Sequence, residues 1–252
     1  MAQFFMRINY KLKRLFVRQP LVINEKIKIE GQQAAYIVHV LRMQEGAEIL
    51  LFNGQDGEWL AKLVTIKKKF VVVQLIHQER FQTALSNLIY CFAPLKTARL
   101  DYMVQKAVEM GVSVLQPVIT HHTQVTRVNM ARMESNVIEA SQQCGILSLP
   151  QCVPAVSLAE FLTLWDETQP LFFCDEAYTP YNPLPLLKKS GTTAMGVLIG
   201  PEGGFSQEER NFLKKHPFVI SIPLGPRILR ADTAAVAALA LLNATIGDWS
   251  MD

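Results

Sequence analysis

Leu198-Ile-Gly-Pro-Glu-Gly-Gly-Phe-Ser-Gln-Glu-Glu209, followed about one strand later by Leu224-Gly-Pro-Arg-Ile-Leu-Arg-Ala-Asp-Thr-Ala234, repeats one design twice. In each stretch an apolar run ends at Gly-Pro, where the backbone can turn sharply, and polar side chains follow. Residues 194–199 and 218–224 therefore predict two strands. Ser206 with Glu209 three residues later predicts the start of a helix. Strand, glycine loop and helix in this order indicate a site for a polar ligand at the carboxyl end of a sheet.

The first stretch alone leaves two interpretations open, because an ordinary strand-to-helix turn has the same pattern and the glycine spacings typical of nucleotide-binding loops are absent. The second stretch favours a ligand-binding site over an ordinary turn. Arg227, Arg230 and Asp232 precede an apolar helix expected from Thr233 onwards. Since the positive end of a helix dipole disfavours two arginines, we expect an anionic or electron-rich partner there.

The two stretches resemble the signature of the SPOUT methyltransferases, in particular the RsmE-type family, which methylates N3 of a uridine in 16S ribosomal RNA. The similarity extends over nearly the whole chain. It includes His39-Val-Leu-Arg42 with Gly46, Gln105-Lys-Ala-Val-Glu-Met-Gly111 with Pro117, and Gln143-Cys-Gly145.

The resemblance implies an α/β fold: a SPOUT domain with a C-terminal deep trefoil knot around a mainly parallel sheet, preceded by a small PUA-like β-barrel. We expect the barrel in residues 1–80, as an RNA-binding domain, and the methyltransferase domain in 81–252. It also implies S-adenosyl-L-methionine as cofactor, 16S RNA or the assembled small subunit as partner, and a homodimer. Ala237, Ala240 and Leu241 would suit close helix packing in that dimer. A reducing cytoplasm is expected from the cysteines, which show no disulfide pattern.

Three sets of site residues are expected from the motif match and, for the lysines at 67–69, from positive charge at a hairpin tip. Catalytic roles are predicted for Arg230 first, then Arg227 and Asp232, because a guanidinium would stabilise and orient the uracil anion. The cofactor is expected at Leu198, Gly200, Glu202, Gly203, Gly204, Ile222, Leu224, Gly225, Ile228, Leu229 and Thr233. RNA contacts are expected at Arg14, Arg42, Lys67, Lys68, Lys69, Lys96, His122 and Arg127.

The chain departs from the family pattern at three places. Asp232 stands where relatives usually have Glu, which weakens the case for direct base catalysis; holding an arginine is its other possible role. Ile146 and the pair His121-His122 stand where an arginine is usual in the family, so RNA docking is expected to differ in detail at these positions. His122 and Arg127 could compensate.

Charge is distributed unevenly along the chain. Residues 1–80 hold 13 Lys and Arg against 7 Asp and Glu, a balance of +6, and the remainder carries −3, which together give the net charge of +3. A basic first domain is typical of a module that grips phosphates, although a solvated basic face is the alternative. The basic stretch over residues 1–20 is interpreted as an arm or the entry into the first strand.

Composition excludes several classes of protein. The 4 cysteines lack C-x-x-C spacing and the 5 histidines form no H-E-x-x-H, so neither a disulfide framework nor a metal site is expected. No apolar run approaches the roughly 20 residues of a membrane helix. Neither G-x-S-x-G nor another evident nucleophile supports a hydrolase.

The order of elements predicts the two domains. A mostly β region comes first, with one helix near residues 32–42, and alternating strands and helices follow. Strands are expected at 14–17, 48–52, 58–66, 70–76, 88–93, 114–119 and 171–174, and helices at 99–110, 129–143, 158–167 and 234–242. Two rival functions stay open: a SPOUT enzyme acting on a ribose hydroxyl or another base, possibly in transfer RNA, and a non-catalytic RNA-binding or ribosome-assembly factor.

Overall fold

The computed structural model describes residues 11–179, 181–190 and 194–250, so residues 1–10 of the predicted N-terminal arm lie outside the described residues. The chain forms two compact units. One runs as far as Ala84 and includes Ser141–Ser148; the other comprises Leu85–Ala140 and Leu149–Asp252. Each unit is described by itself.

The first unit is a curled five-stranded sheet in the order β1-β3-β4-β5-β2. Its strands are β1 (Arg14–Phe16), β2 (Lys26–Glu30), β3 (Glu48–Phe52), β4 (Glu58–Ile66) and β5 (Phe70–Arg80). Register shifts between β4 and β5 bend this pair, as bulges do. Alternate residues such as Ile27, Ile29, Leu63, Val71 and Val73 face one apolar core.

The strands predicted at 48–52 and 58–66 are confirmed. Three expectations differ from the structure. The short β2, whose alternation Lys-Ile-Lys-Ile-Glu buries only the isoleucines, was not predicted. The strand expected to end at 76 continues to Arg80. The helix expected over 32–42 is α1 (Gly31–Ala35) followed by a π-helical turn, η1 (Tyr36–Val40), and Arg42 has a positive φ of 51° that ends it.

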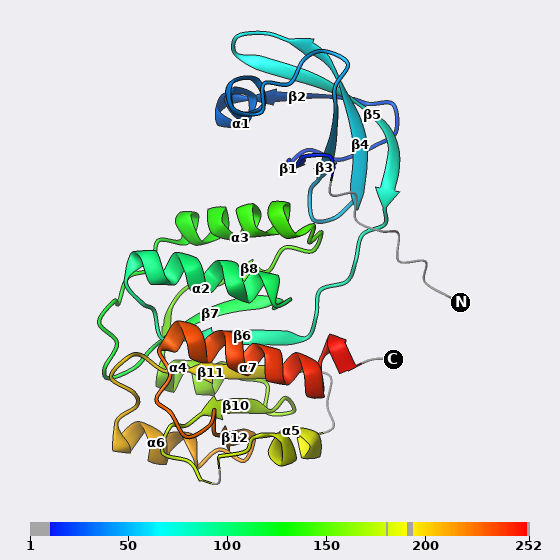
Figure 1. The fold of residues 1–252 in the computed structure, drawn as a ribbon. Coiled ribbons are helices and arrows are strands. Elements are labelled where there is room, and N and C mark those ends of the chain that lie inside the picture. Colours follow the sequence, from blue (N-terminus) through cyan, green and yellow to red (C-terminus); the bar gives the residue numbers. More distant parts are fainter. Residues whose placement is uncertain (1–10, 180, 191–193, 251–252) are drawn as a thin grey trace. The chain divides into compact units, whose positions relative to one another are not determined.

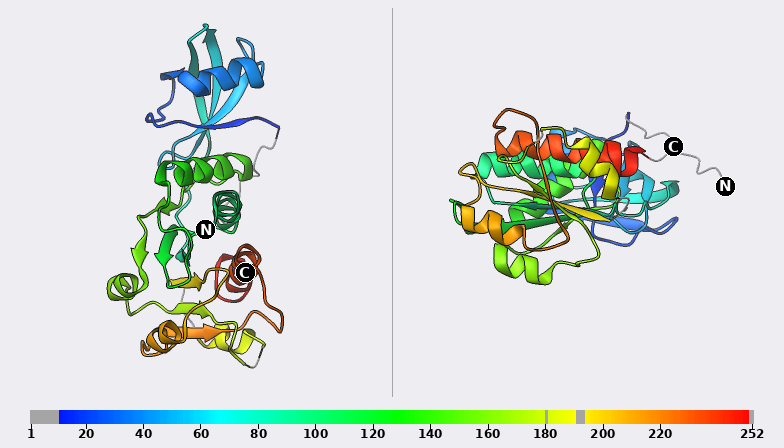
Figure 2. Two further views of the ribbon diagram at one scale, coloured as in Figure 1. Left: turned by 90° about the vertical axis from the view of Figure 1, so that its left-hand side faces the viewer. Right: turned by 90° about the horizontal axis from the view of Figure 1, so that it is seen from below.

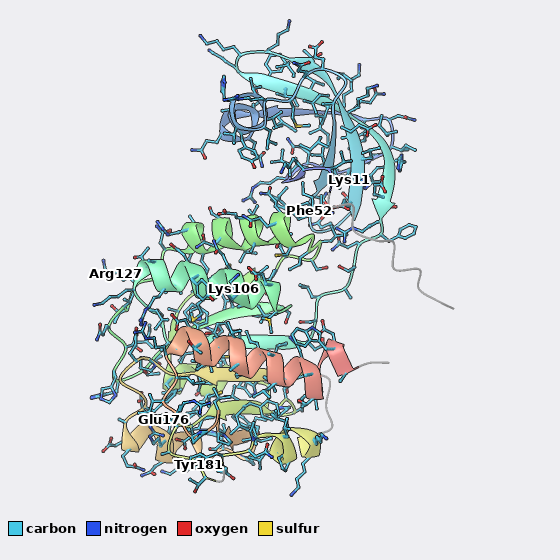
Figure 3. The ribbon with its side chains drawn as sticks, in the orientation of Figure 1. Lys11, Phe52, Lys106, Arg127, Glu176 and Tyr181 are labelled. Carbon is cyan, nitrogen blue, oxygen red and sulfur yellow. The ribbon has the colours of Figure 1, made fainter. Side chains whose placement is uncertain are left out.

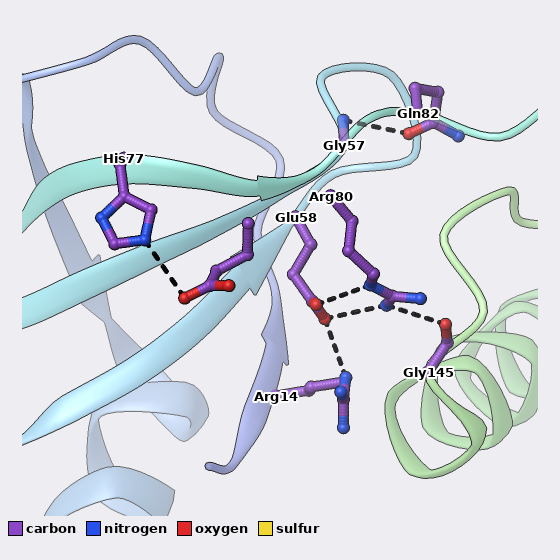
Figure 4. Close-up of polar contacts among 8 residues, drawn as sticks. Arg14, Gly57, Glu58, His77, Arg80, Gln82 and Gly145 are labelled. Carbon is purple, nitrogen blue, oxygen red and sulfur yellow. Dashed lines mark hydrogen bonds and ion pairs between the residues drawn. The ribbon is translucent and has the colours of Figure 1, made fainter. Parts of the chain in front are cut away.

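A buried carboxylate ties the strand ends of this unit together (Figure 4). Glu58 is 1% exposed and accepts hydrogen bonds from Arg14 Nε at 2.8 Å and Arg80 Nε at 2.7 Å. Arg80 Nη2 also donates to the Gly145 carbonyl oxygen at 2.9 Å. A buried charge is tolerated because two guanidinium groups compensate it.

The second unit is built on a parallel sheet in the order β12-β10-β11-β6-β7-β8, with β9 also paired to β7 (Figure 1). Its strands are β6 (Leu88–Phe92), β7 (Val114–Ile119), β8 (Gln151–Cys152), β9 (Val156–Ser157), β10 (Leu171–Cys174), β11 (Met195–Ile199) and β12 (Val219–Ile222). Its helices are α2 (Thr97–Glu109), α3 (Met130–Cys144), α4 (Leu158–Leu164), α5 (Leu184–Ser190), α6 (Gln207–Leu213), α7 (Ala231–Thr245) and the 3₁₀ turn η2 (Asp248–Ser250). The last residues of α3, from Ser141, belong to the first unit.

Helices cover both faces of this sheet, as Figure 2 shows from below. Helices α2 and α7 pack together on one face, where Tyr90 Oη donates to Met103 Sδ at 2.8 Å. Helices α4 and α6 cover the other face through a cluster that contains Phe161, Leu213 and Phe173. Burial on both faces explains why the strands are continuously apolar, with Met195–Ile199 wholly buried.

The mainly parallel α/β sheet and the PUA-like first unit confirm the predicted fold class, and the strands predicted at 114–119 and 171–174 are confirmed. Differences concern ends: α7 begins at Ala231 rather than at Thr233, α4 ends at Leu164, and β12 is shorter than residues 218–224. The knot stays a prediction of the resemblance. No helix among the described residues is long and apolar enough to cross a membrane.

Candidate active site

Three loops at the carboxyl end of the sheet surround one cavity of about 380 Å³. They follow the adjacent strands β10, β11 and β12, which places the two motif loops side by side although a helix and a strand separate them in the sequence. The lining residues are Cys174, Asp175, Glu176, Tyr181, Ile199, Gly200, Pro201, Glu202, Gly203, Gly204, Leu224, Gly225, Pro226, Arg227, Ile228, Leu229, Ala231 and Ala234. The cavity therefore has a loop-built polar rim and an apolar wall.

Glycines of the first motif are required by close packing as well as by turning. A Cβ on Gly200 would lie 2.5 Å from Cε2 of the buried Phe205 ring. Gly204 has a φ of +66°, and a Cβ there would meet Glu176 Oε1, the far end of a half-exposed side chain. The residue type therefore follows from space at Gly200 and from the positive φ at Gly204, since the Glu176 side chain could move aside.

The loop after β10 is held by Arg210 of α6. Its guanidinium pairs with Asp175, whose side chain is fully buried, and with the half-exposed Glu176, and its Nε donates to the Phe205 carbonyl oxygen at 3.3 Å. Lys214 Nζ lies 3.0 Å from Asp175 Oδ2. Glu176 and Tyr181 are labelled in Figure 3 on this segment. The network fixes the orientation of a loop that lines the cavity.

Desolvation keeps the thiol of Cys174, one of the lining residues, protonated. Desolvation raises the pKa of Cys174 well above its ordinary range, and the charge of Glu176 raises it further. Desolvation likewise raises the pKa of the buried Tyr90 phenol, with smaller contributions from Cys174, Cys91 and Asp232. These groups are neutral at physiological pH and act as packing residues.

Arg99 forms ion pairs with both motif loops. Arg99 Nη1, on α2, is 3.2 Å from Glu202 Oε1 of the first motif, and its Nε is 3.9 Å from Asp232 Oδ2 of the second. Arg227 and Arg230 are exposed and form no ion pair with any residue that the structure describes. Arg227, which lines the cavity, and Arg230, which precedes α7, are thus free to meet a polar ligand.

The structure brings together nine of the predicted cofactor and catalytic residues as cavity lining: Gly200, Glu202, Gly203, Gly204, Leu224, Gly225, Arg227, Ile228 and Leu229. Leu198 and Ile222 are fully buried in their strands, so only their backbone atoms remain for a ligand. Arg230, Asp232 and Thr233 are at the start of α7 and do not line the cavity. The roles of all these residues stay predictions.

The sequence interpretation missed the third loop, with Asp175, Glu176 and Tyr181, and it also missed Arg99. A signal was available for the loop, because the strand at 171–174 was predicted and parallel strands present their carboxyl ends at one edge. No pattern in the sequence pointed to Arg99. Its position follows from the placement of β6 beside β11.

The predicted RNA contacts differ in exposure. Lys67, Lys68 and Lys69 are exposed between β4 and β5, and Arg42, Lys96 and Arg127 are exposed as well. His122 is exposed and its Nδ1 lies 3.1 Å from the Gly204 carbonyl oxygen. Arg14 is different: its side chain is 5% exposed and engaged by Glu58, which leaves little of it for RNA.

Two family models match the chain. A model described as an RNA methyltransferase domain matches residues 82–243, and one described as an RNA methyltransferase PUA domain matches residues 29–76.

Relatives match over nearly the full length. The ribosomal RNA small subunit methyltransferase E of Rickettsia conorii is 31% identical over 232 residues, which cover 91% of this chain and 94% of the relative. The protein of the same name from Buchnera aphidicola is 28% identical, with 96% of each chain covered.

Solved structures are similar over more than nine-tenths of the chain. A methyltransferase from Legionella pneumophila with the bound cofactor SAM has a TM-score of 0.81 and 29% identity, covering 94% of this chain and 98% of that one. The ribosomal RNA small subunit methyltransferase E of Neisseria gonorrhoeae bound to S-adenosyl methionine has a TM-score of 0.80 and 25% identity, covering 92% and 97%.

Proposed function

Because this chain belongs to the RNA methyltransferase family that includes the ribosomal RNA small subunit methyltransferases E, we propose that it methylates N3 of one uridine in 16S ribosomal RNA. The observation that carries the proposal is the meeting of both motif loops around one cavity. A cavity of about 380 Å³ is within the usual range for a small-molecule site.

The residues present fit S-adenosylmethionine. Gly200, Gly203 and Gly204 keep the backbone of one wall open to close approach, while Leu224, Ile228 and Leu229 offer apolar surface and backbone groups to an adenine ring. Glu176 and Glu202 place carboxylates where the cationic end of the cofactor could be bound. When bound, the cofactor supplies a methyl group on a sulfonium, so the new N3–C bond forms as the S–C bond breaks and sulfur keeps the electron pair.

The chain's own residues orient and neutralise the uracil. Its N3–H is weakly acidic, and loss of that proton spreads negative charge over N3 and two carbonyl oxygens, which a guanidinium can bind. Arg230, which precedes α7, is the first candidate for this task, and Arg227, which lines the cavity, is the second. Both are exposed and free of ion pairs among the described residues. Catalysis would rest mainly on positioning.

Asp232 is better suited to hold an arginine than to accept the proton. Its Oδ1 accepts the Thr233 N–H at 2.8 Å, and its Oδ2 lies 3.9 Å from Arg99. We therefore assign the N3 proton to solvent. An Asp232→Asn enzyme should keep the shape of its pH–rate profile; loss of the fall in rate on the acidic side would restore the role of general base.

We also propose the assembled small subunit as substrate, with the basic first unit contacting RNA through Lys67, Lys68 and Lys69. Pairing of two copies through the methyltransferase domain and a cytoplasmic location complete the proposal. Ala237, Ala240 and Leu241 on α7 are the residues offered for the pairing.

The test is mass mapping of 16S RNA from a strain that lacks this protein. We expect loss of one N3-methyluridine, which also removes a stop to reverse transcription because the methyl group blocks the pairing edge. Purified protein should restore it on isolated subunits and not on free RNA. Unchanged N3 methylation in that strain, or a methyl group found on a ribose, would overturn the proposal. If the protein failed to bind S-adenosylmethionine in calorimetry, an assembly factor would be favoured.

A further inference from the structure

A second hollow of about 450 Å³ lies at the same edge of the sheet. It is lined by Lys96, Ala98, Arg99, Gln124 and Glu202. Resting on the proposed function, we propose that this hollow binds the target nucleotide, with Lys96 on its phosphate and Arg99 on a carbonyl oxygen of the uracil.

Strand order explains why this hollow adjoins the cofactor cavity. In the sheet, β11 lies between β10 and β6, and β7 follows β6. The cofactor cavity uses the loops after β12, β10 and β11, whereas the hollow uses those after β11, β6 and β7. Glu202, on the loop after β11, lines both. A methyl donor in one and an acceptor in the other would meet across this residue.

The charges of the hollow suit a nucleotide. Lys96 is exposed and forms no ion pair within the described ranges of the chain, so its ammonium is available to a phosphate. The carboxylate of Glu202 would repel a phosphate, but Arg99 lies 3.2 Å from it and compensates its charge. Arg99 is 36% exposed in its side chain and retains guanidinium N–H groups for a ligand.

Arg99 is held from two sides, by Glu202 and, at 3.9 Å, by Asp232. These carboxylates belong to the two motif loops, so α2 contributes a donor to the meeting point of both. Gln124 adds an amide, which can donate and accept hydrogen bonds along the edge of a uracil. The hollow therefore offers a cation for the phosphate and directional donors for the base.

The test compares Lys96→Gln, Arg99→Gln and Arg99→Lys with the wild type, using small subunits from a strain that lacks this protein. Lys96→Gln should raise KM for subunits about tenfold with kcat unchanged, and lower the dependence of affinity on salt by about one ion. Arg99→Gln should lower kcat about 100-fold, with partial rescue in Arg99→Lys. The calorimetric Kd for S-adenosylmethionine should stay within about threefold in all three.

Arg132→Gln is the matched control, because Arg132 is an ion-paired, exposed arginine of the same unit that lines neither hollow. If the Lys96 and Arg99 variants behave like this control, the inference is wrong. If the wild type methylates a different position, the proposed function fails while the variants still report on the hollow.

Chemical footprinting of lysines tests the inference on the wild-type protein, without any substitution. Acetylation of lysines, followed by mass spectrometry, should show Lys96 protected when subunits are bound, with the exposed Lys188 as comparator. Equal reactivity of Lys96 in the free and bound protein would overturn the assignment.

Discussion

Replacing Arg210 with Met should make the cofactor cavity less ordered, because the loop after β10 loses the ion pairs that hold it in place. The substitution keeps the apolar stem and removes the guanidinium that pairs with Asp175 and Glu176. The Asp175 side chain is 0% exposed, so its carboxylate would stay buried with less compensation. Breaking a buried pair from one side costs roughly 3–5 kcal/mol.

Two features reduce that cost. Lys214 Nζ remains 3.0 Å from Asp175 Oδ2, and the Ala177 N–H still donates to Asp175 Oδ1 at 3.1 Å. The pair with Glu176 adds little, since that side chain is 44% exposed. We expect a loss of about 3 kcal/mol, which lowers Tm by roughly 6–12 °C in a domain of this size. The Kd for S-adenosylmethionine should rise about tenfold as Glu176 and Tyr181 lose their orientation.

Calorimetric melting with and without S-adenosylmethionine measures both effects. Arg132→Met, which removes an exposed ion pair with Asp101, should leave the transition in place. The double variant Asp175→Asn with Arg210→Met should be more stable than the sum of the single changes, because no buried charge is left uncompensated. Additive losses, or an Arg210→Met protein as stable as the Arg132→Met control, would refute the reasoning.

Three further predictions concern other positions. Gly200→Ala should lower the free energy of unfolding by about 1–3 kcal/mol and weaken cofactor binding, because the new Cβ meets the buried Phe205 ring. Gly225→Ala, with a φ of +89° but nothing within 4 Å of the new Cβ, should cost only about 1 kcal/mol of backbone strain. Equal losses of stability for the two variants in urea unfolding would contradict this. Stability should fall as pH rises above about 8.5, the ordinary thiol value, because burial raises the pKa of Cys91 and Cys174 in the folded state and the unfolded chain releases these protons first. Cys91→Ala should flatten that slope by about 1.4 kcal/mol per pH unit, and an unchanged slope between pH 9 and 10 would count against a buried, protonated thiol. Glu58→Gln should destabilise the first unit by about 3–5 kcal/mol, since it leaves the charges of Arg14 and Arg80 uncompensated. Amide hydrogen exchange should then become faster in that unit only. A loss below about 1 kcal/mol would show that the arginines are solvated.

The sequence determined the fold class and both motif loops, because these depend on short-range physics. Apolar runs predict the buried strands β7 and β10 at their observed bounds, and the capping box of Ser206 with Glu209 forms as expected. Glycine at position 200 is required by a contact with Phe205, which belongs to the same motif, and glycine at position 204 suits a φ of +66°. Family membership followed from these motifs and their order.

Only the tertiary structure decided which distant segments complete the site. In a parallel sheet, neighbouring strands are separated by helices in the sequence, so strand order is not readable from local patterns. The order β12-β10-β11-β6-β7 brings Glu176 to the first motif loop and Arg99 to both motifs, although Arg99 and Glu202 are 103 residues apart. Burial is also a tertiary property: it pairs Arg14 with Glu58, although the charge of Arg14 had predicted a contact with RNA. Local sequence patterns identify the two motif loops, and long-range packing determines which distant residues contact them.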